Sequence, residues 1–301
     1  MLQCFDCLTR TLCLFAVLTA QAPIPQNLLK YIGARTVVDR SPSELIAAFP
    51  ELKGLEFMQS QDGLSSLLAR VGDRVQALFH DFPNTSSLER VCLERLGDRG
   101  EVVARVNREF QYLLIMRGGE RGNAIEEDRT DTKGRQVNLE EIKRYHLLSG
   151  GYSSIPMYFH PSFRTDSIFR YLGKERTGRI AHVIAFAQRP EAARLIGTFL
   201  SLQNPLRFFV QGIAWIDPAN YQIVRMRTEL LNPVADLQRN TAEIQLEEIH
   251  VGQESRVLWL PHEVVVTTQW MGRVFRNRHR YSDYRLFTVE TREDQKRVIK
   301  P

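Results

Sequence analysis

The feature that most constrains the fold is a long succession of strand-like segments, which begins near residue 101 and leaves little room for helices. These segments are rich in Val, Ile, Phe, Tyr and Trp, the residues that favour strands. Two connections between them have turn chemistry, Asp217-Pro218-Ala219-Asn220 and Met271-Gly272-Arg273. Since strands joined directly by short turns pair antiparallel, the sequence predicts a large antiparallel sheet over residues 101–292.

Helical spacing dominates the part of the chain before this sheet. Ser41-Pro42-Ser43-Glu44 combines the capping oxygen and the proline of a helix start. Apolar residues at three- and four-residue spacing predict an amphipathic helix over 64–80. A further helix is expected from Asn84 through Leu96, and a short helix within the strand region from Glu191 to Leu200. The predicted fold class is therefore α+β, with an N-terminal helical region over 23–100 packed on the sheet in one domain, and a tail at 293–301.

The first residues have the order of a secretory signal peptide. Arg10 precedes the apolar run Thr11–Thr19, and Ala20-Gln21-Ala22 follows as an A-x-A cleavage site. The apolar run is too short to span a bilayer as a stable helix. We therefore expect a cleavable signal peptide over 1–22, ending near Ala22, and a secreted or periplasmic protein. The alternative is a short uncleaved anchor.

Cysteine use and charge narrow the chemistry further. Cys4, Cys7 and Cys13 lie in the predicted signal peptide, so the mature chain would keep only Cys92 and form no internal disulfide. Its stability must then come from a core, for which 43% hydrophobic residues suffice. The net charge of +5 is too mild and too interspersed to indicate nucleic acid. It is compatible with contact with an anionic membrane surface.

Alternation along the strands separates their two faces. Some strands are apolar on both faces, for example 208–216, and such strands need a cover on each side. One cover can be the helices. The other can be a ligand or the segment 138–174, a Gly-, Pro- and aromatic-rich stretch that we expect to cross a sheet face or the mouth of a cavity. A second layer of core remains an equal alternative to a ligand cavity.

Arginines gather on the polar faces of other strands. Alternation predicts a solvated cross-strand charge ladder of Arg225 and Arg227 with Glu243 and Glu247. In residues 275–287 it places Arg276, Arg278 and Arg280 on the face opposite His279 and Tyr281, which would pack inward. The arginines that could contact a partner are Arg225, Arg227, Arg276, Arg278 and Arg280.

Catalytic and cofactor motifs are not found in the sequence. None of the seven histidines has a metal-ligand spacing, so no metal site is predicted. The stretch 149–154 lacks the lysine of a phosphate-binding loop and the frame of a nucleophile elbow. Glu126-Glu127 and Glu247-Glu248 are strand neighbours that face opposite ways. We therefore expect no cofactor and no enzymatic activity.

Four segments of the strand region carry a resemblance: REFQYLLIMR, VQGIAWIDPANYQIVRMRTEL, LWLPHEVVVTTQW and RNRHRYSDYRLF. Over about 40–290 they resemble a group of uncharacterised secreted bacterial proteins. The V-x-G-x-x-W-I-D-P core, followed by a strand with two arginines, is distantly similar to the periplasmic lipoprotein-carrier (LolA-like) superfamily. The resemblance implies a curved, incomplete antiparallel barrel, closed by helices over an apolar cavity that holds acyl chains. The residues expected to line this cavity are Phe209, Ile213, Trp215, Val224, Met226, Val266 and Trp270.

Three functions remain open at the level of the sequence. The first is a non-enzymatic envelope protein that binds a lipid or a lipidated protein, to which burial contributes about 0.8 kcal/mol per methylene. The second is an envelope module that senses or contacts another protein through its arginines. The third is a secreted hydrolase that uses the 138–174 segment with His146 or His160.

Overall fold

A computed structural model describes residues 31, 33–80, 84–117, 124–135, 137, 155–176, 180–200, 205–252 and 256–287. Its helices are α2 (Pro42–Ala48) and α3 (Leu64–His80), with 3-10 helices η1 (Pro50–Leu52), η2 (Ile155–Phe159) and η3 (Arg164–Asp166). The strands are β1 (Glu56–Phe57), β2 (Thr85–Leu96), β3 (Val102–Arg117), β4 (Ala124–Thr130), β5 (Ser167–Glu175), β6 (Ala181–Gln188), β7 (Gly197–Leu200), β8 (Pro205–Phe208), β9 (Val210–Ile216), β10 (Ile223–Leu230), β11 (Leu237–Val251), β12 (Arg256–Trp270) and β13 (Arg273–Leu286).

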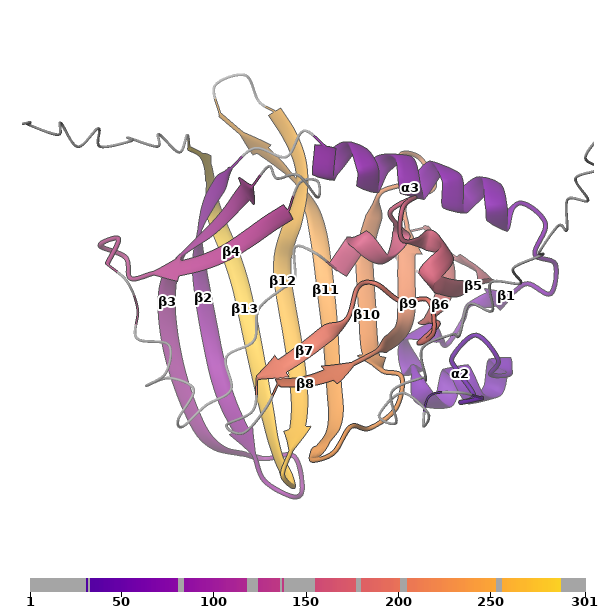
Figure 1. Cartoon of the computed structure of the whole chain (residues 1–301), viewed down its shortest axis with the longest axis horizontal. Helices are drawn as coiled ribbons and strands as arrows, with labels where there is room; N and C mark the ends of the chain where they lie inside the picture. Colours follow the sequence, from indigo (N-terminus) through magenta and orange to yellow (C-terminus); the bar gives the residue numbers. More distant parts are fainter. Residues whose placement is uncertain are drawn as a thin grey trace, which may run out of the picture.

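One large antiparallel sheet organises the described chain. Its order is β1-β5-β6-β9-β10-β11-β12-β13-β2-β3-β4, and β7 and β8 form a separate hairpin. The strands curve strongly around one side, but the edge strands β1 and β4 do not pair with each other (Figure 1). The fold is therefore an α+β incomplete barrel, which confirms the predicted fold class.

Register irregularities accompany this curvature. They interrupt the pairing within β5–β6, β9–β10, β11–β12, β13–β2 and β2–β3. Each such bulge bends its strand and increases the local right-handed twist. A long, irregular sheet of this kind coils without closing.

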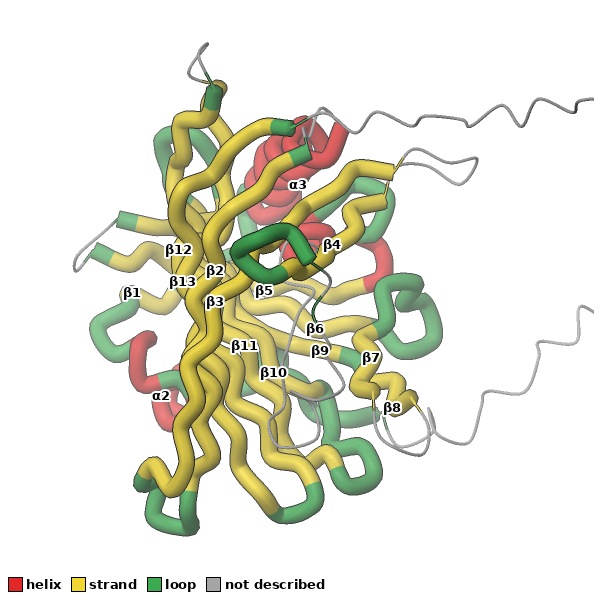
Figure 2. Tube along the Cα trace, turned by 90° about the vertical axis from the view of Figure 1, so that its left-hand side faces the viewer, coloured by secondary structure: helices red, strands yellow, loops and turns green. Residues whose placement is uncertain are grey.

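The two faces of the sheet carry different covers. Figure 2 shows α2 on one side of the sheet and α3 on the other. α3, η2 and the β7–β8 hairpin lie on the concave side, whereas α2 and η1 lie on the convex side. The α3 helix buries one stripe, made of Leu68, Val71, Gly72 and Val75. This amphipathic helix confirms the prediction for 64–80.

Phe186 in β6 anchors the concave cover. It stacks on Tyr158 of η2, with ring centroids 5.5 Å apart, and meets Phe159 edge-on at 5.5 Å. Phe159 also contacts Phe169 of β5 at 5.2 Å. A Cβ on Gly72 would lie 3.2 Å from the Phe159 carbonyl oxygen, so α3 rests directly on η2. The cover is thus two layers thick over β5 and β6.

The convex cover buries the apolar side chains of Val37, Leu45 and Phe49, and polar contacts from the segment before and within α2 add to this packing. The predicted helix start is confirmed, because Ser41 and Glu44 form a complete capping box. The buried Val37 backbone N–H donates to the Gln211 side-chain oxygen at 2.8 Å. Arg170 of β5 donates to the Val38 carbonyl oxygen at 3.1 Å. These bonds tie the N-terminal segment to β9 and β5.

Three expectations about individual segments are wrong. Thr85–Leu96, expected to be helical, is β2 and pairs with β13 and β3. Its burial alternates like that of a strand, and pairing on both sides overrides the helix-forming Leu, Glu and Arg residues. Gly197–Leu200 is strand β7, although 191–200 was expected to be a short helix. Within 138–174, Ser167 onward is strand β5 of the sheet itself.

Several predictions fall outside the described residues. These are the signal peptide over 1–22 with its three cysteines, the segment 138–154 with His146, and the tail at 293–301. Among the described helices, none has the length and apolarity needed to cross a membrane. Cys92 is a free thiol in β2.

The aromatic anchor can be tested by truncation. We expect Phe186→Ala to lower the free energy of unfolding by about 3–5 kcal/mol, because it leaves a cavity between β6 and η2. The control is Val257→Ala in β12, where the side chain is 46% exposed and the change should stay within about 0.5 kcal/mol. Urea unfolding followed by tryptophan fluorescence measures both. Equal losses in the two variants would contradict this packing.

Candidate functional site

The seven residues expected to line one apolar cavity are divided between the two faces of the sheet. Ile213 and Trp215 lie directly opposite Arg227 and Arg225 in the β9–β10 pairing. Both arginines contact Glu51 of η1, which lies on the convex side, so Ile213 and Trp215 lie on the convex face as well. Phe209 also lies on this side, where its ring meets that of Tyr31 at 5.1 Å. Strand alternation groups these residues correctly, but the assignment to the inner face is wrong. The convex cover, and not a cavity, explains why this side of β9 is apolar.

Val224 also faces the convex side because it is the extra residue at a bulge. The register moves from Ile223↔Ile216 to Arg225↔Trp215, which leaves Val224 without a pairing partner. Val224, Trp215 and Arg225 line a shallow hollow of about 320 Å³. The Arg225 guanidinium lies 4.5 Å from the centroid of the Trp215 ring, a cation–π contact that forms one wall.

The remaining candidates, Met226, Val266 and Trp270, lie on the concave face. Met226 pairs with Ile244, and Ile244 pairs with Val264, so one apolar row crosses β10, β11 and β12. Met226 and Val264 have no exposed surface. Trp270 lies at the end of β12, where its ring contacts Phe199 of β7 at 5.5 Å. The structure therefore brings these three predicted residues to one face, beneath α3, η2 and the β7–β8 hairpin.

Further along the same face, the apolar row gives way to a buried polar cluster. Val264 pairs with His279, which pairs with Val91 of β2. His279 and Glu89 have no exposed surface, and Tyr281 is almost fully buried. His279 Nδ1 lies 2.8 Å from Glu89 Oε1, and the Tyr281 hydroxyl donates to the same oxygen at 3.0 Å.

Arg129 completes this cluster from the edge strand β4. Its Nε donates to Glu89 Oε2 at 2.6 Å and its Nη2 donates to Glu89 Oε1 at 2.9 Å. Arg129 pairs with Tyr112 of β3, and its guanidinium lies 5.2 Å from the centroid of that ring. The ion pair therefore reaches across β3 and joins β4 to β2. Both charged groups are more than nine-tenths buried, so each needs the opposite charge of the other to offset the cost of removing it from water.

Burial and hydrogen bonding set the ionisation of this cluster. Burial alone would raise the pKa of Glu89, but the hydrogen bonds from Arg129 and His279 outweigh it and lower the pKa to about 2. Burial lowers the pKa of His279 below its ordinary value, although Glu89 opposes this effect. The cluster therefore contains an ionised carboxylate, a guanidinium and a neutral imidazole that donates from Nδ1.

Sequence reasoning places His279 and Tyr281 together on the inward face but misses Glu89, because it treats residues 84–96 as a helix. The usable signal was the alternation in Leu88-Glu89-Arg90-Val91-Cys92-Leu93. Read as a strand, this stretch puts Glu89 on the same face as Val91 and Leu93. An acidic residue on an apolar face indicates a buried partner.

The predicted partner-surface arginines lie on the convex face and are engaged in ion pairs. Arg276 and Arg278 lie 2.7 Å and 3.7 Å from Glu94 Oε2, and Arg280 lies 3.2 Å from Glu263. Their separation from His279 confirms the predicted alternation. Only 2% of the Glu94 side chain is exposed, so it acts as the centre of this group.

Arg225 and Arg227 form a charge ladder that only partly matches the prediction. Arg225 forms an ion pair with Glu243 at 2.6 Å, as expected. Arg227 pairs with Glu51 of η1 at 2.6 Å, and its guanidinium lies over the Phe49 ring. Glu247 instead lies 3.6 Å from His262. These arginines thus help to attach the convex cover to the sheet.

The histidine of the hydrolase alternative that the structure describes is His160. Its Nδ1 accepts a hydrogen bond from the Ser162 backbone N–H at 3.2 Å, and its ring packs against Phe163. Burial lowers the pKa of His160. In the described part of the chain, no group of three His, Cys, Asp or Glu side chains is arranged to hold a metal ion.

No family model and no curated protein matches this chain. Among solved structures, it is similar to a DUF1329 family protein from Desulfovibrio piger, with a TM-score of 0.42 and 8% identity over 77% of this chain and 96% of that one. It is also similar to a LolA superfamily protein from Nitrosomonas europaea, with a TM-score of 0.35 and 12% identity over 75% of this chain and 94% of that one. With TM-scores below 0.5, neither likeness bears on the family or the function of this chain.

Removing the charge of Glu89 tests the buried ion pair. We expect Glu89→Gln to destabilise the protein by about 3–5 kcal/mol, because Arg129 is left buried without a counter-ion. The matched control is Glu109→Gln, which breaks the exposed pair with Arg90 and should cost no more than about 1 kcal/mol. Urea unfolding compares the two. A loss for Glu89→Gln as small as that of the control would contradict a compensated buried pair.

The low pKa of His279 predicts a pH dependence of stability. The unfolded chain binds a proton at His279 near pH 6.5, whereas the folded chain does so only at lower pH. The free energy of unfolding should therefore fall as the pH drops below about 6.5, until the folded-state pKa is reached. His279→Gln should flatten this fall, with a residual slope from His160 and His182. Urea midpoints from pH 7.5 to 5 measure the effect, and identical slopes would overturn it.

Proposed function

We propose that this chain is a non-enzymatic protein of the cell envelope that binds an acyl chain, of a lipid or of a lipidated protein, on the concave face of its sheet. The observation that carries the proposal is the continuous apolar surface from Phe186 through Met226 and Ile244 to Val264. It lies beneath a cover made of separate, small elements. An acyl chain needs an elongated apolar surface of this kind and no directional polar partners.

The attachment of the cover supports a displaceable lid. The α3 helix buries one stripe, while its other contacts to the β9–β10 turn are polar and exposed. Arg70 lies 2.5 Å from the Tyr221 hydroxyl, and Arg74 donates to the Asn220 carbonyl oxygen at 2.9 Å. Exposed contacts of this type add little stability, so displacing α3 mainly costs the burial of its apolar stripe. An acyl chain that takes the place of this stripe would offset that cost.

The buried cluster around Glu89 supports a structural role for the polar part of the concave face. His279 and Glu89 have the partner geometry of an acid–base pair, but neither has exposed surface. A general base must come within about 2.6–3.2 Å of the proton that it abstracts. The cluster would fix β4 to β2 and form the end wall of the apolar face.

Location in the periplasm or outside the cell, by way of the predicted signal peptide ending near Ala22, belongs to this proposal. An envelope module that contacts another protein is the second candidate. It is favoured by two exposed arginines on the convex face. The side chain of Arg278 is 45% exposed and that of Arg280 is 71% exposed. A pulldown in which both arginines are changed to Glu would separate this function from lipid binding.

A comparison of two equivalent core truncations tests the proposed lid. Val71 in α3 and Val37 on the convex side are both fully buried. We expect Val71→Ala to accelerate the uptake of a fluorescent fatty acid several-fold, because it loosens the concave cover. Val37→Ala removes the same atoms and should leave the uptake rate unchanged. Stopped-flow fluorescence measures both rates, and urea unfolding checks that the two variants are destabilised to a similar degree.

Two results would contradict the proposed function. One is the lack of saturable uptake by the unmodified protein, together with no stoichiometric lipid in an organic extract of protein purified from its host. The other is equal acceleration in Val71→Ala and Val37→Ala, which would indicate that uptake reports global unfolding.

A further inference from the structure

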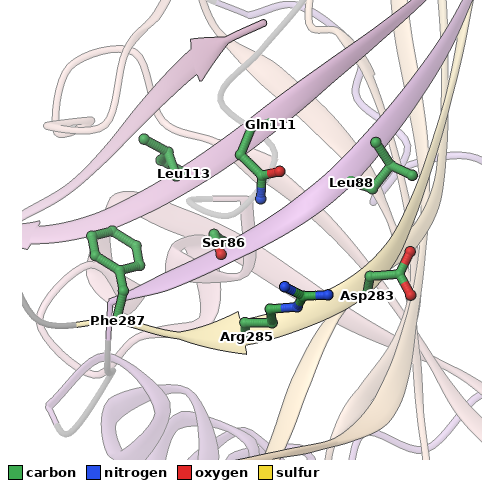
Figure 3. Close-up of a pocket in the computed structure, with 7 residues that line it drawn as sticks. All are labelled: Ser86, Leu88, Gln111, Leu113, Asp283, Arg285 and Phe287. Carbon is green, nitrogen blue, oxygen red and sulfur yellow. The ribbon is translucent and has the colours of Figure 1, made fainter. Parts of the chain in front are cut away.

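A second hollow, of about 450 Å³, opens on the convex face of the sheet, on the opposite side from the proposed acyl site. It lies over β13, β2 and β3, near the place where β13 ends. The Phe287 backbone N–H donates to the Asn84 carbonyl oxygen at 3.1 Å and holds this end of β13 against the start of β2. Figure 3 shows the side chains that line the hollow.

A β-bulge in β13 builds this hollow. Ser282 pairs with Leu88 and Arg285 pairs with Ser86, so Asp283 and Tyr284 together oppose one residue of β2. Asp283 has a φ of 56°, in the left-handed region where glycine is the usual occupant of such a bulge. The Tyr284 hydroxyl bonds to the Pro261 carbonyl oxygen at 2.7 Å. The bulge thereby brings a carboxylate and a guanidinium to the same hollow.

Hydrogen-bond donors from three adjacent strands converge there. Arg285 lies directly opposite Ser86, and Gln111 of β3 pairs with Leu88, one step along the same face. Directly opposed side chains have Cβ atoms about 5 Å apart, and diagonal ones about 7–8 Å apart. Figure 3 shows the Gln111 amide pointing from β3 toward β2, and the Arg285 guanidinium lying between Ser86 and Asp283. One carboxylate or phosphate group could therefore contact all three donors.

The Asp283 carboxylate and the Arg285 guanidinium do not form an ion pair with each other. Among the described residues, no carboxylate lies within ion-pair distance of Arg285. The Asp283 carboxylate accepts a hydrogen bond from the Ser282 hydroxyl at 3.0 Å. Leu88, Leu113 and Phe287 add apolar wall around them. A hollow with one cation, one anion and an apolar wall is complementary to a small amphipathic zwitterion.

We infer that this hollow binds a small zwitterion, with its carboxylate or phosphate at Arg285, Ser86 and Gln111 and its ammonium group at Asp283. Two sources share this chemistry. One is an amino acid or dipeptide, and the other is a phosphoethanolamine headgroup. The inference does not rest on the proposed acyl site, because the two surfaces lie on opposite faces of the sheet.

Calorimetric titration of the protein tests this site with four probes: phosphoethanolamine, glycyl-leucine, inorganic phosphate and ethanolamine. We expect saturable binding of at least one zwitterion and binding at least tenfold weaker of the two single-charge probes. Preference for phosphoethanolamine would assign the headgroup, and preference for glycyl-leucine would assign the amino acid or peptide.

Two variants locate the binding and one controls it. Asp283→Gly keeps a residue suited to the left-handed bulge and removes the carboxylate, and Arg285→Gln removes the guanidinium. Each should weaken zwitterion binding at least tenfold. Arg280→Gln, on the same strand and face, should leave it unchanged. The inference is overturned if no zwitterion binds saturably, if phosphate alone binds as tightly, or if Asp283→Gly binds like the unmodified protein.

Discussion

The structure depends on one constraint, which is that an unclosed antiparallel sheet with apolar residues on both faces must be covered twice. A closed barrel would enclose one apolar face and expose the other. Here β6 and β9 are buried on both sides, so the chain supplies α2, η1 and the preceding segment on the convex face, and α3 and η2 on the concave face. The covers differ in attachment. Both covers bury apolar side chains. The convex one is also held by the buried hydrogen bond from Val37 to Gln211 and by partly buried ion pairs such as Arg227–Glu51, whereas the hydrogen bonds from α3 are exposed.

This difference gives the two faces different roles. Apolar packing is non-directional, so a helix held mainly by it can be replaced by another apolar surface at little additional cost. Buried hydrogen bonds are costly to break without new partners. The concave cover is therefore the one that the proposed acyl chain would displace, while the convex cover and the Glu89–Arg129 pair keep the curved frame in shape.

Much of the architecture could be predicted from the sequence, because its signals are local. The capping residues Ser41 and Glu44, the spacing of α3 and the alternation in β10 and β11 each depend on nearby residues. The faces to which Ile213 and Trp215 belong could not be predicted, since inward and outward are defined only by the sense of curvature of the whole sheet. Val224 changes sides through a bulge that no local pattern indicates.

The polar part of the site was missed for a related reason. Leu, Glu and Arg in 88–96 favour a helix in isolation, and only pairing with the distant β13 makes this stretch a strand. Once β2 is a strand, Glu89 meets His279 and Tyr281, which are about 190 residues away in the sequence. A contact over such a separation is created by the topology and leaves no signature in either segment.

The central proposal is that an acyl chain displaces the concave cover. Its most direct test is hydrogen–deuterium exchange of the protein with and without a saturating long-chain fatty acid. If an acyl chain displaces the concave cover, exchange of the backbone amides changes in α3 (Leu64–His80) and η2 (Ile155–Phe159), while α2 (Pro42–Ala48) on the convex face keeps its protection. Unchanged exchange in α3 and η2 at saturation, or an equal change in all three elements, would contradict it.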